Sequence, residues 1–145
     1  MKLKHMYAAL TAAITLSASS GFAAEPSAEA AYKDIEATLG IVPGHFKGYP
    51  QSAVAGAWEM TKGLLMGESN TLEPKVKSLI AVAVAAQIPC EYCVWLETKT
   101  AKSAGATDAE VSEAVAQAAY VRHWSTVIHG LQIDFDTFKA EFGGE

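Results

Sequence analysis

The sequence predicts an all-α protein. Apolar residues recur three and four positions apart along most of the chain, and glycines and capping residues divide it into segments of helical length. No stretch alternates apolar and polar residues as a half-buried strand would. With 145 residues, of which 50% are hydrophobic, the chain is long enough to form one domain with its own core.

The first 23 residues have the pattern of a secretory signal peptide. Two lysines precede a short apolar stretch, and the small residues Gly21 and Ala23 predict cleavage after Ala23. The apolar stretch, residues 6–16, is too short to span a bilayer, which argues against a membrane anchor. We therefore expect residues 24–145 to form a single exported domain, located in the periplasm and without a membrane span.

About six helices are expected in that domain. They cover residues 28–39, about 51–66, a third helix with Pro74 in its first turn that runs to about Gln87, 91–104, 107–120 or beyond, and roughly 125–142, the last with room for a kink at Gly130. Residues 41–50 contain two prolines and two glycines and are expected to form a turn-rich connector. Asn70 or Thr71 is expected to cap the third helix with Glu73 as partner, and Thr107 and Glu110 have the spacing of a capping box.

The third predicted helix is the most hydrophobic, and it leads to the only two cysteines of the chain. Cys90 and Cys93 have CxxC spacing and lie at the N-terminus of the next predicted helix. A structural disulfide would close a very short loop and stabilise little, and a zinc site would need two further ligands that no second Cys or His pair supplies. Haem attachment would need a histidine at position 94, where the chain has valine. A redox dithiol remains, and the unpaired N–H groups of a helix N-terminus favour the thiolate form that such chemistry requires.

The charge distribution gives little indication of a macromolecular partner. The net charge is −5, and no basic cluster is present, which argues against a nucleic-acid partner.

Residues 73–130 resemble the carboxymuconolactone decarboxylase superfamily, in particular its alkylhydroperoxidase D-like branch. The matching segments lie in the expected order: Lys77 to Ala85, Cys90-Glu-Tyr-Cys93, Ala101 to Glu110, and Arg122-His-Trp-Ser-Thr126. The resemblance implies an all-α fold that forms homo-oligomers, and a thiol peroxidase chemistry without haem, metal or another cofactor.

The resemblance also implies roles for the two cysteines. Cys93 would be the peroxidatic thiol that a hydroperoxide oxidises to a sulfenic acid, and Cys90 would resolve it as a disulfide. An unidentified dithiol donor would then reduce the disulfide. Position in the helix does not by itself choose between the cysteines, and a comparison with thioredoxin would favour the more N-terminal Cys90.

Two positions depart from the family pattern. Where the family relay has a glutamate and a histidine, this chain has Ser78 and Glu97. A carboxylate beside a thiol disfavours the thiolate, although Glu97 could act as a base if burial made it more basic. We hypothesise that His123 reaches the dithiol from another helix and works with Glu97. The alternative is that His123 only joins two helices.

The sequence therefore predicts an exported thiol-dependent peroxidase. One alternative is a decarboxylating lyase of the same superfamily, although its members resemble this chain without needing the cysteine pair. The other is a non-catalytic oligomeric protein that takes part in redox interactions, if the altered relay has abolished activity.

Overall fold

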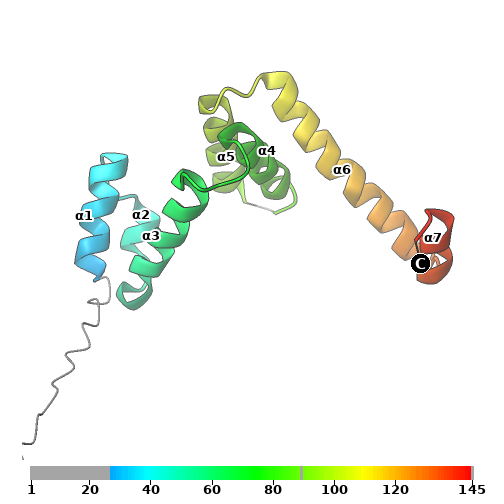
Figure 1. The fold of residues 1–145 in the computed structure, drawn as a ribbon, viewed down its shortest axis with the longest axis horizontal. Coiled ribbons are helices and arrows are strands. Elements are labelled where there is room, and N and C mark those ends of the chain that lie inside the picture. The colour runs from blue at the N-terminus through cyan, green and yellow to red at the C-terminus, as the bar shows by residue number, and fades with distance from the viewer. Residues whose placement is uncertain (1–26, 89, 145) are drawn as a thin grey trace, which may run out of the picture. The chain divides into compact units, whose positions relative to one another are not determined.

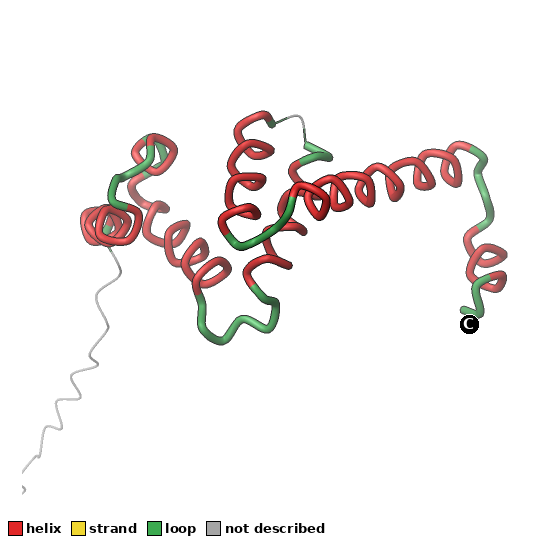
Figure 2. The backbone as a smooth tube through the Cα atoms, turned by 90° about the horizontal axis from the view of Figure 1, so that it is seen from above, coloured by secondary structure: helices red, strands yellow, loops and turns green. Residues whose placement is uncertain are grey.

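The computed structural model describes residues 27–88 and 90–144, and every regular element in these ranges is an α-helix (Figures 1 and 2). The all-α prediction is therefore confirmed. The helices are α1 (Ala28–Leu39), α2 (Gly44–Lys47), α3 (Gln51–Met66), α4 (Pro74–Ala85), α5 (Glu91–Ser103), α6 (Asp108–Gly130) and α7 (Phe135–Glu141). The predicted signal peptide lies outside the described residues.

The chain divides into two compact units, Met1–Gly56 and Ala57–Glu145. In the first unit, Ser27 caps α1 by accepting a hydrogen bond from the N–H of Ala30, and Gly40 ends that helix in the left-handed region at φ 77°. The buried side chains of this unit are Ala31, Ile35, Phe46, Val54 and Ala55.

The connector of the first unit differs from its prediction. Residues 44–47 form the short helix α2 where only turns were expected. Pro43 precedes its first residue, and a proline just before a helix can supply extended backbone at the N-cap without losing a helical hydrogen bond. Phe46 is buried, and its carbonyl accepts a hydrogen bond from the hydroxyl of Tyr32 at 3.4 Å. The helical turn thus places one aromatic side chain in the core.

In the second unit, α4 and α5 form a hairpin that also contacts α6 (Figure 1). Val82, Ala101 and Ala106 form its buried cluster, and Leu79 and Val111 pack against that cluster. Two of the three buried residues are alanines, so the helices can approach closely. The hairpin is the scaffold on which both cysteines are carried.

The turn before α4 is not capped as predicted. Glu73 occupies the N-cap position without a side-chain hydrogen bond. The side-chain amide of Asn70 instead donates to the carbonyls of Gly63 and Leu64, at 3.1 and 3.0 Å, near the end of α3. The prediction was wrong because carbonyls left unpaired at a helix C-terminus compete for the same side chain.

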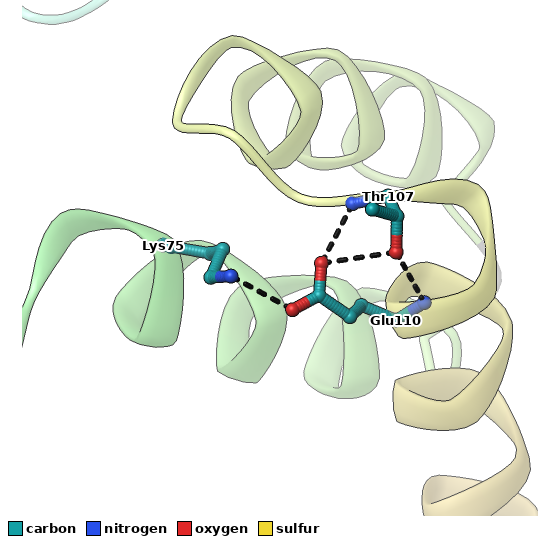
Figure 3. A network of polar contacts seen from close by, with 3 residues as sticks. All are labelled: Lys75, Thr107 and Glu110. Carbon is teal, nitrogen blue, oxygen red and sulfur yellow. Dashed lines mark hydrogen bonds and ion pairs between the residues drawn. The ribbon is translucent and has the colours of Figure 1, made fainter.

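Helix α6 begins with the predicted capping box, which is confirmed (Figure 3). Thr107 Oγ1 accepts from the N–H of Glu110, and the Glu110 carboxylate accepts from the N–H of Thr107 at 2.7 Å. The same carboxylate pairs with Lys75 of α4 at 2.7 Å. These contacts, with the Lys75 hydrogen bond contributing most, lower the pKa of Glu110 from 4.5 to about 2.

The boundary between the last two helices lies later in the chain than predicted, because α6 includes the residues where the sixth helix was expected to begin. The helix continues without a break from Asp108 to Gly130, a length of 23 residues, and a separate helix, α7, follows at Phe135. Asp134 caps α7 by accepting from the N–H of Thr137, and this hydrogen bond lowers the pKa of Asp134. Gly130 therefore ends a helix instead of kinking one, and the described residues contain seven helices instead of about six.

Within the described residues, none of the helices is long and apolar enough to cross a membrane.

Candidate redox site

The two cysteines are joined as a disulfide at the N-terminus of α5, where the sequence placed them. Their Cα atoms are 5.4 Å apart. Cys90 is the N-cap residue, with extended backbone at φ −132°, and its sulfur accepts a hydrogen bond from the N–H of Cys93 at 3.2 Å. A sulfur in this position replaces the oxygen of a usual N-cap side chain, and a helix N-terminus stabilises negative charge on it. A thiolate at position 90 would therefore be stabilised by the start of α5.

Cys93 also lines a cavity of about 530 Å³, which we call the Cys93 cavity. Its lining comes from α3, the following turn, α4 and α5: Leu64, Leu65, Leu72, Lys77, Ile80, Ala81, Val84, Ala85, Ile88, Cys93 and Glu97. The volume is in the range of small-molecule sites, and most of the lining is aliphatic, as in such sites. Cys90 is not among the lining residues, so the two sulfurs have different surroundings.

A larger surface groove, of about 900 Å³, is lined by other residues of α5. Trp95 and Lys99 lie in it, with the Lys99 ammonium 5.0 Å from the Trp95 ring centre. Neither cysteine lines this groove. We therefore take the smaller cavity as the candidate site, because Cys93 lines it.

Glu97 shares the Cys93 cavity. It lies four residues after Cys93 on α5, a spacing that places both side chains on one face of the helix. The structure thus places the predicted carboxylate at the same cavity as the predicted peroxidatic cysteine. A carboxylate in this position can exchange a proton with a thiol or with an oxygen bound near it.

Ser78, the other position that departs from the family pattern, does not lie at the Cys93 cavity. Its side chain is buried, and its hydroxyl donates to the carbonyl of Pro74 at 2.9 Å within α4. This bond satisfies the hydroxyl inside its own helix. Ser78 does not line the Cys93 cavity, and so it does not replace the glutamate of the family relay there.

His123 lies on α6, and its side chain is exposed. Its ring contacts Trp124 edge-on, with ring centres 5.1 Å apart, and it is not among the residues that line the Cys93 cavity. The structure therefore does not bring His123 together with Glu97 at this cavity. Its participation in the relay stays a prediction.

Sequence reasoning gave no role to the neighbour of His123, Arg122. The Arg122 guanidinium donates through Nε to the side-chain oxygen of Gln87 at 2.8 Å. Gln87 lies in the turn between α4 and α5, three residues before Cys90. Arg122 therefore ties α6 to the segment that leads into the cysteine pair.

Lys77 was also missed. It lies in a helix whose other side chains are mostly apolar, and its ammonium donates to the carbonyls of Leu64 and Leu65 at 3.0 and 3.3 Å. The signal available in the sequence was a lysine inside an otherwise apolar helix face. In the part of the chain that the structure describes, no group of three or more His, Cys, Asp or Glu side chains could hold a metal ion.

Comparison with known proteins identifies the family. The model of the carboxymuconolactone decarboxylase family matches residues 53–134, more than half of the chain. The chain belongs to this family. Its fold is similar to that of the alkylhydroperoxidase AhpD core from Rhodospirillum rubrum, with a TM-score of 0.66 and 28% sequence identity over 77% of this chain and 85% of that one. No curated protein matches the chain. The resemblance to the AhpD-like branch is thus confirmed.

Proposed function

We propose that this protein is a thiol-dependent peroxidase that reduces hydroperoxides through Cys93 and Cys90. The observation that carries the proposal is the disulfide itself, one of whose sulfurs borders an apolar cavity that also contains a carboxylate. Membership of a family that includes alkylhydroperoxidases supports it.

The reaction needs two sulfurs and one external donor. The Cys93 thiolate attacks the terminal oxygen of the hydroperoxide, so an S–O bond forms, the O–O bond breaks, and the alkoxide leaves as an alcohol after taking a proton. The Cys90 thiolate then attacks the sulfenic sulfur, which forms the disulfide and releases water once a proton is supplied. A dithiol donor returns two electrons and two protons. Glu97 is the carboxylate among the residues that line the cavity, and it lies on the same helix face as Cys93, so we assign these proton transfers to it.

The order of the two cysteines rests on their surroundings. Cys93 borders the cavity in which a peroxide would lie, whereas Cys90 caps the helix and does not line that cavity. A capped sulfur is stabilised as a thiolate and therefore serves well as the leaving group when the donor reopens the disulfide.

The decisive experiment is a thiol titration of the reduced protein before and after one equivalent of hydroperoxide. We expect the loss of two thiols per chain, no reaction in Cys93→Ser, and a sulfenic acid at Cys93 in Cys90→Ser, detected by dimedone labelling and mass spectrometry. Unreacted thiols in the wild type would support the non-catalytic alternative. A sulfenic acid at Cys90 in Cys93→Ser would reverse the assigned roles.

The relay is tested by the variants Glu97→Gln and His123→Gln, with His129→Gln on the same helix as the control. We expect Glu97→Gln to slow peroxide-dependent thiol loss by about 100-fold or more, because a positioned acid–base group commonly contributes that much to a rate. A rate in Glu97→Gln equal to that of the wild type would remove Glu97 from the mechanism. A slower rate in His123→Gln but not in His129→Gln would place His123 in the relay.

We further propose that the protein acts as a homo-oligomer. Helix α6 has no buried residue, although it carries Tyr120, Val121 and Trp124, which are between 45% and 60% exposed. Apolar surface of this kind marks an interaction site in soluble proteins. A second copy that covers α6 would remove these side chains from water.

Export to the periplasm is a proposal that rests on the sequence of residues 1–23 alone. It predicts that the protein recovered from an exporting host begins at Ala24, which N-terminal sequencing would show. The dithiol donor would then have to act in the same compartment.

A further inference from the structure

The Cys93 cavity is open on the side of α4. Of its residues on that helix, Ile80 is 50% exposed and Val84 is 55% exposed. Both also line a second groove, of about 460 Å³, which continues from α4 onto α6. The lining of this α4–α6 groove is Ile80, Ala83, Val84, Gln87, Ala118, Val121, Arg122 and Ser125. One largely apolar surface therefore runs from Cys93 on α5 across α4 to Val121 on α6.

The two sides of this surface carry opposite charges. On the α5 side, the Glu97 carboxylate makes no hydrogen bond or ion pair with any residue that the structure describes. On the α6 side, the Arg122 guanidinium donates through Nε to the uncharged side chain of Gln87, which leaves its terminal N–H groups for another acceptor. Lys77, the other cation of this surface, is bound to two carbonyls at the end of α3.

A surface with this arrangement of charges is complementary to itself. In a two-fold dimer every contact occurs twice, because a residue that meets another across the axis is itself met by the copy of that residue. Ile80 and Val84 belong to both linings and therefore mark the middle of the surface. With the axis at this middle, α5 of each copy faces α6 of the other, and the Glu97 side meets the Arg122 side twice.

The carboxylate favours a second copy over an apolar partner. Any molecule that covers the Cys93 cavity takes Glu97 out of water, and a buried carboxylate is unfavourable unless a cation or several donors pair with it. A guanidinium matches a carboxylate with two parallel hydrogen bonds, and Arg122 has the terminal N–H groups for them. A second copy thus brings both the apolar cover and the missing cation.

We infer that the Cys93 site is completed by a second copy of the chain, whose Arg122 pairs with Glu97 while the α4 helices of the two copies pack at Ile80 and Val84. The inference rests on the proposed function for the reaction and for the association of chains. The guanidinium adds a positive charge near Cys93, which favours the thiolate and offsets the like charge of Glu97. Each copy therefore supplies Arg122 to the site of the other.

Charge reversal in separate chains tests the pairing. Glu97→Arg sets two cations against each other in a dimer of identical chains, and Arg122→Glu sets two carboxylates, so we expect each variant alone to sediment as a single chain. An equimolar mixture restores both pairs with the charges exchanged, and we expect its mass to return to that of the wild type. Lys99→Glu and Glu113→Arg change the same charges on α5 and α6 outside both linings, and they should keep the wild-type mass alone and mixed.

A mixture that stays monomeric would overturn the inference, because mixing restores only a pair that forms between chains. Unchanged mass in both single variants would overturn it as well. Where circular dichroism shows that a variant is unfolded, cross-linking decides instead. In a background of Cys90→Ser and Cys93→Ser, differently tagged chains with Glu97→Cys and with Arg122→Cys should form mixed disulfide dimers on oxidation, and cysteines at the two control positions should not. Absence of mixed dimers would contradict the pairing.

Dilution of the reduced wild type separates this inference from the proposed function. The rate of peroxide-dependent thiol loss per chain should fall about tenfold once the chains dissociate, which is the effect of one nearby charge on the thiolate. An undiminished rate in dissociated chains would leave the peroxidase function standing and overturn the shared site. Restored association in the mixture, with no peroxide reduction by the wild type at any concentration, would support the interface and refute the peroxidase function.

Discussion

The α4–α5 hairpin and helix α6 differ in where their apolar side chains lie. The hairpin buries Val82 and Ala101 in a cluster that holds its two helices together. Helix α6 is nearly twice as long as α4, yet none of its residues is buried, and Val121 is 60% exposed. The hairpin that carries the cysteines therefore contains most of the buried cluster, to which Val111 at the start of α6 adds, whereas the later part of α6 presents apolar surface. This difference predicts that substitutions in the hairpin change the free energy of unfolding, whereas substitutions on the exposed face of α6 change the proposed association between chains.

The largest effect is expected for Val82→Asp in the hairpin, and it is a loss of stability. Val82 is 2% exposed, and a carboxylate there would be buried without a partner. We expect a loss of about 4 kcal/mol in the free energy of unfolding, enough to unfold many domains of this size. Urea denaturation followed by circular dichroism measures it. A loss below about 1 kcal/mol, the size of an ordinary surface effect, would show that the cluster around Val82 does not hold the hairpin.

The next largest effect is expected for Val121→Asp on α6, and it is a change in the number of chains that associate. Because Val121 is exposed, the new carboxylate stays in water within one chain, and we expect the helical circular dichroism spectrum to be unchanged. We expect the mass measured by sedimentation to fall to that of a single chain. Ser112→Asp adds the same charge to an exposed polar position of α6 and should leave the mass unchanged. An unchanged mass in Val121→Asp would show that this part of α6 is not an interface.

Helix ends are predicted best where a residue next to the end, such as a glycine or a capping side chain, determines it. Residues 28–39 and 51–66 were predicted with the bounds that the structure shows, because Gly40 and Gly67 end the two segments. The capping box at Thr107 was found for the same reason. Each of these signals lies within a few residues of the helix end that it sets.

The predictions of helix caps and boundaries were wrong where a side chain could bond to more than one helix, or where no residue marked the end of a helix. Asn70 bonds back to α3 instead of capping α4. The predicted break before Ser125 is absent, since no strong helix breaker precedes Gly130. The role of Lys77 depends on carbonyls of α3 that only the folded turn brings to it, so the sequence of α4 alone could not show it.

A smaller effect on stability is expected at Glu110 of α6, which pairs with Lys75 of the hairpin. Its pKa is lowered to about 2 by Lys75 and Thr107, so the folded protein binds fewer protons than the unfolded chain between that value and 4.5. The stabilisation is therefore complete above about pH 4.5 and is lost as the pH falls toward 2. We expect Glu110→Gln to have a lower free energy of unfolding than the wild type at neutral pH. The difference in free energy between the two proteins should shrink as the pH falls from 4.5 toward 2, which urea denaturation at a series of pH values would measure. Glu113→Gln, one turn later on α6, is the control and should show no such narrowing.

The smallest effect is expected at the cap of α5, inside the hairpin. Cys90→Ser and Cys90→Ala both remove the disulfide, so their difference isolates the hydrogen bond from the N–H of Cys93 to the side chain at position 90. A serine hydroxyl can accept this bond and an alanine cannot, and we expect Cys90→Ser to be the more stable by about 1 kcal/mol. Urea denaturation under reducing conditions gives the comparison, and the mass of both variants should equal that of the wild type. Equal stability would mean that position 90 does not cap α5, and that the sulfur of Cys90 has no advantage as the leaving group when the disulfide is reduced.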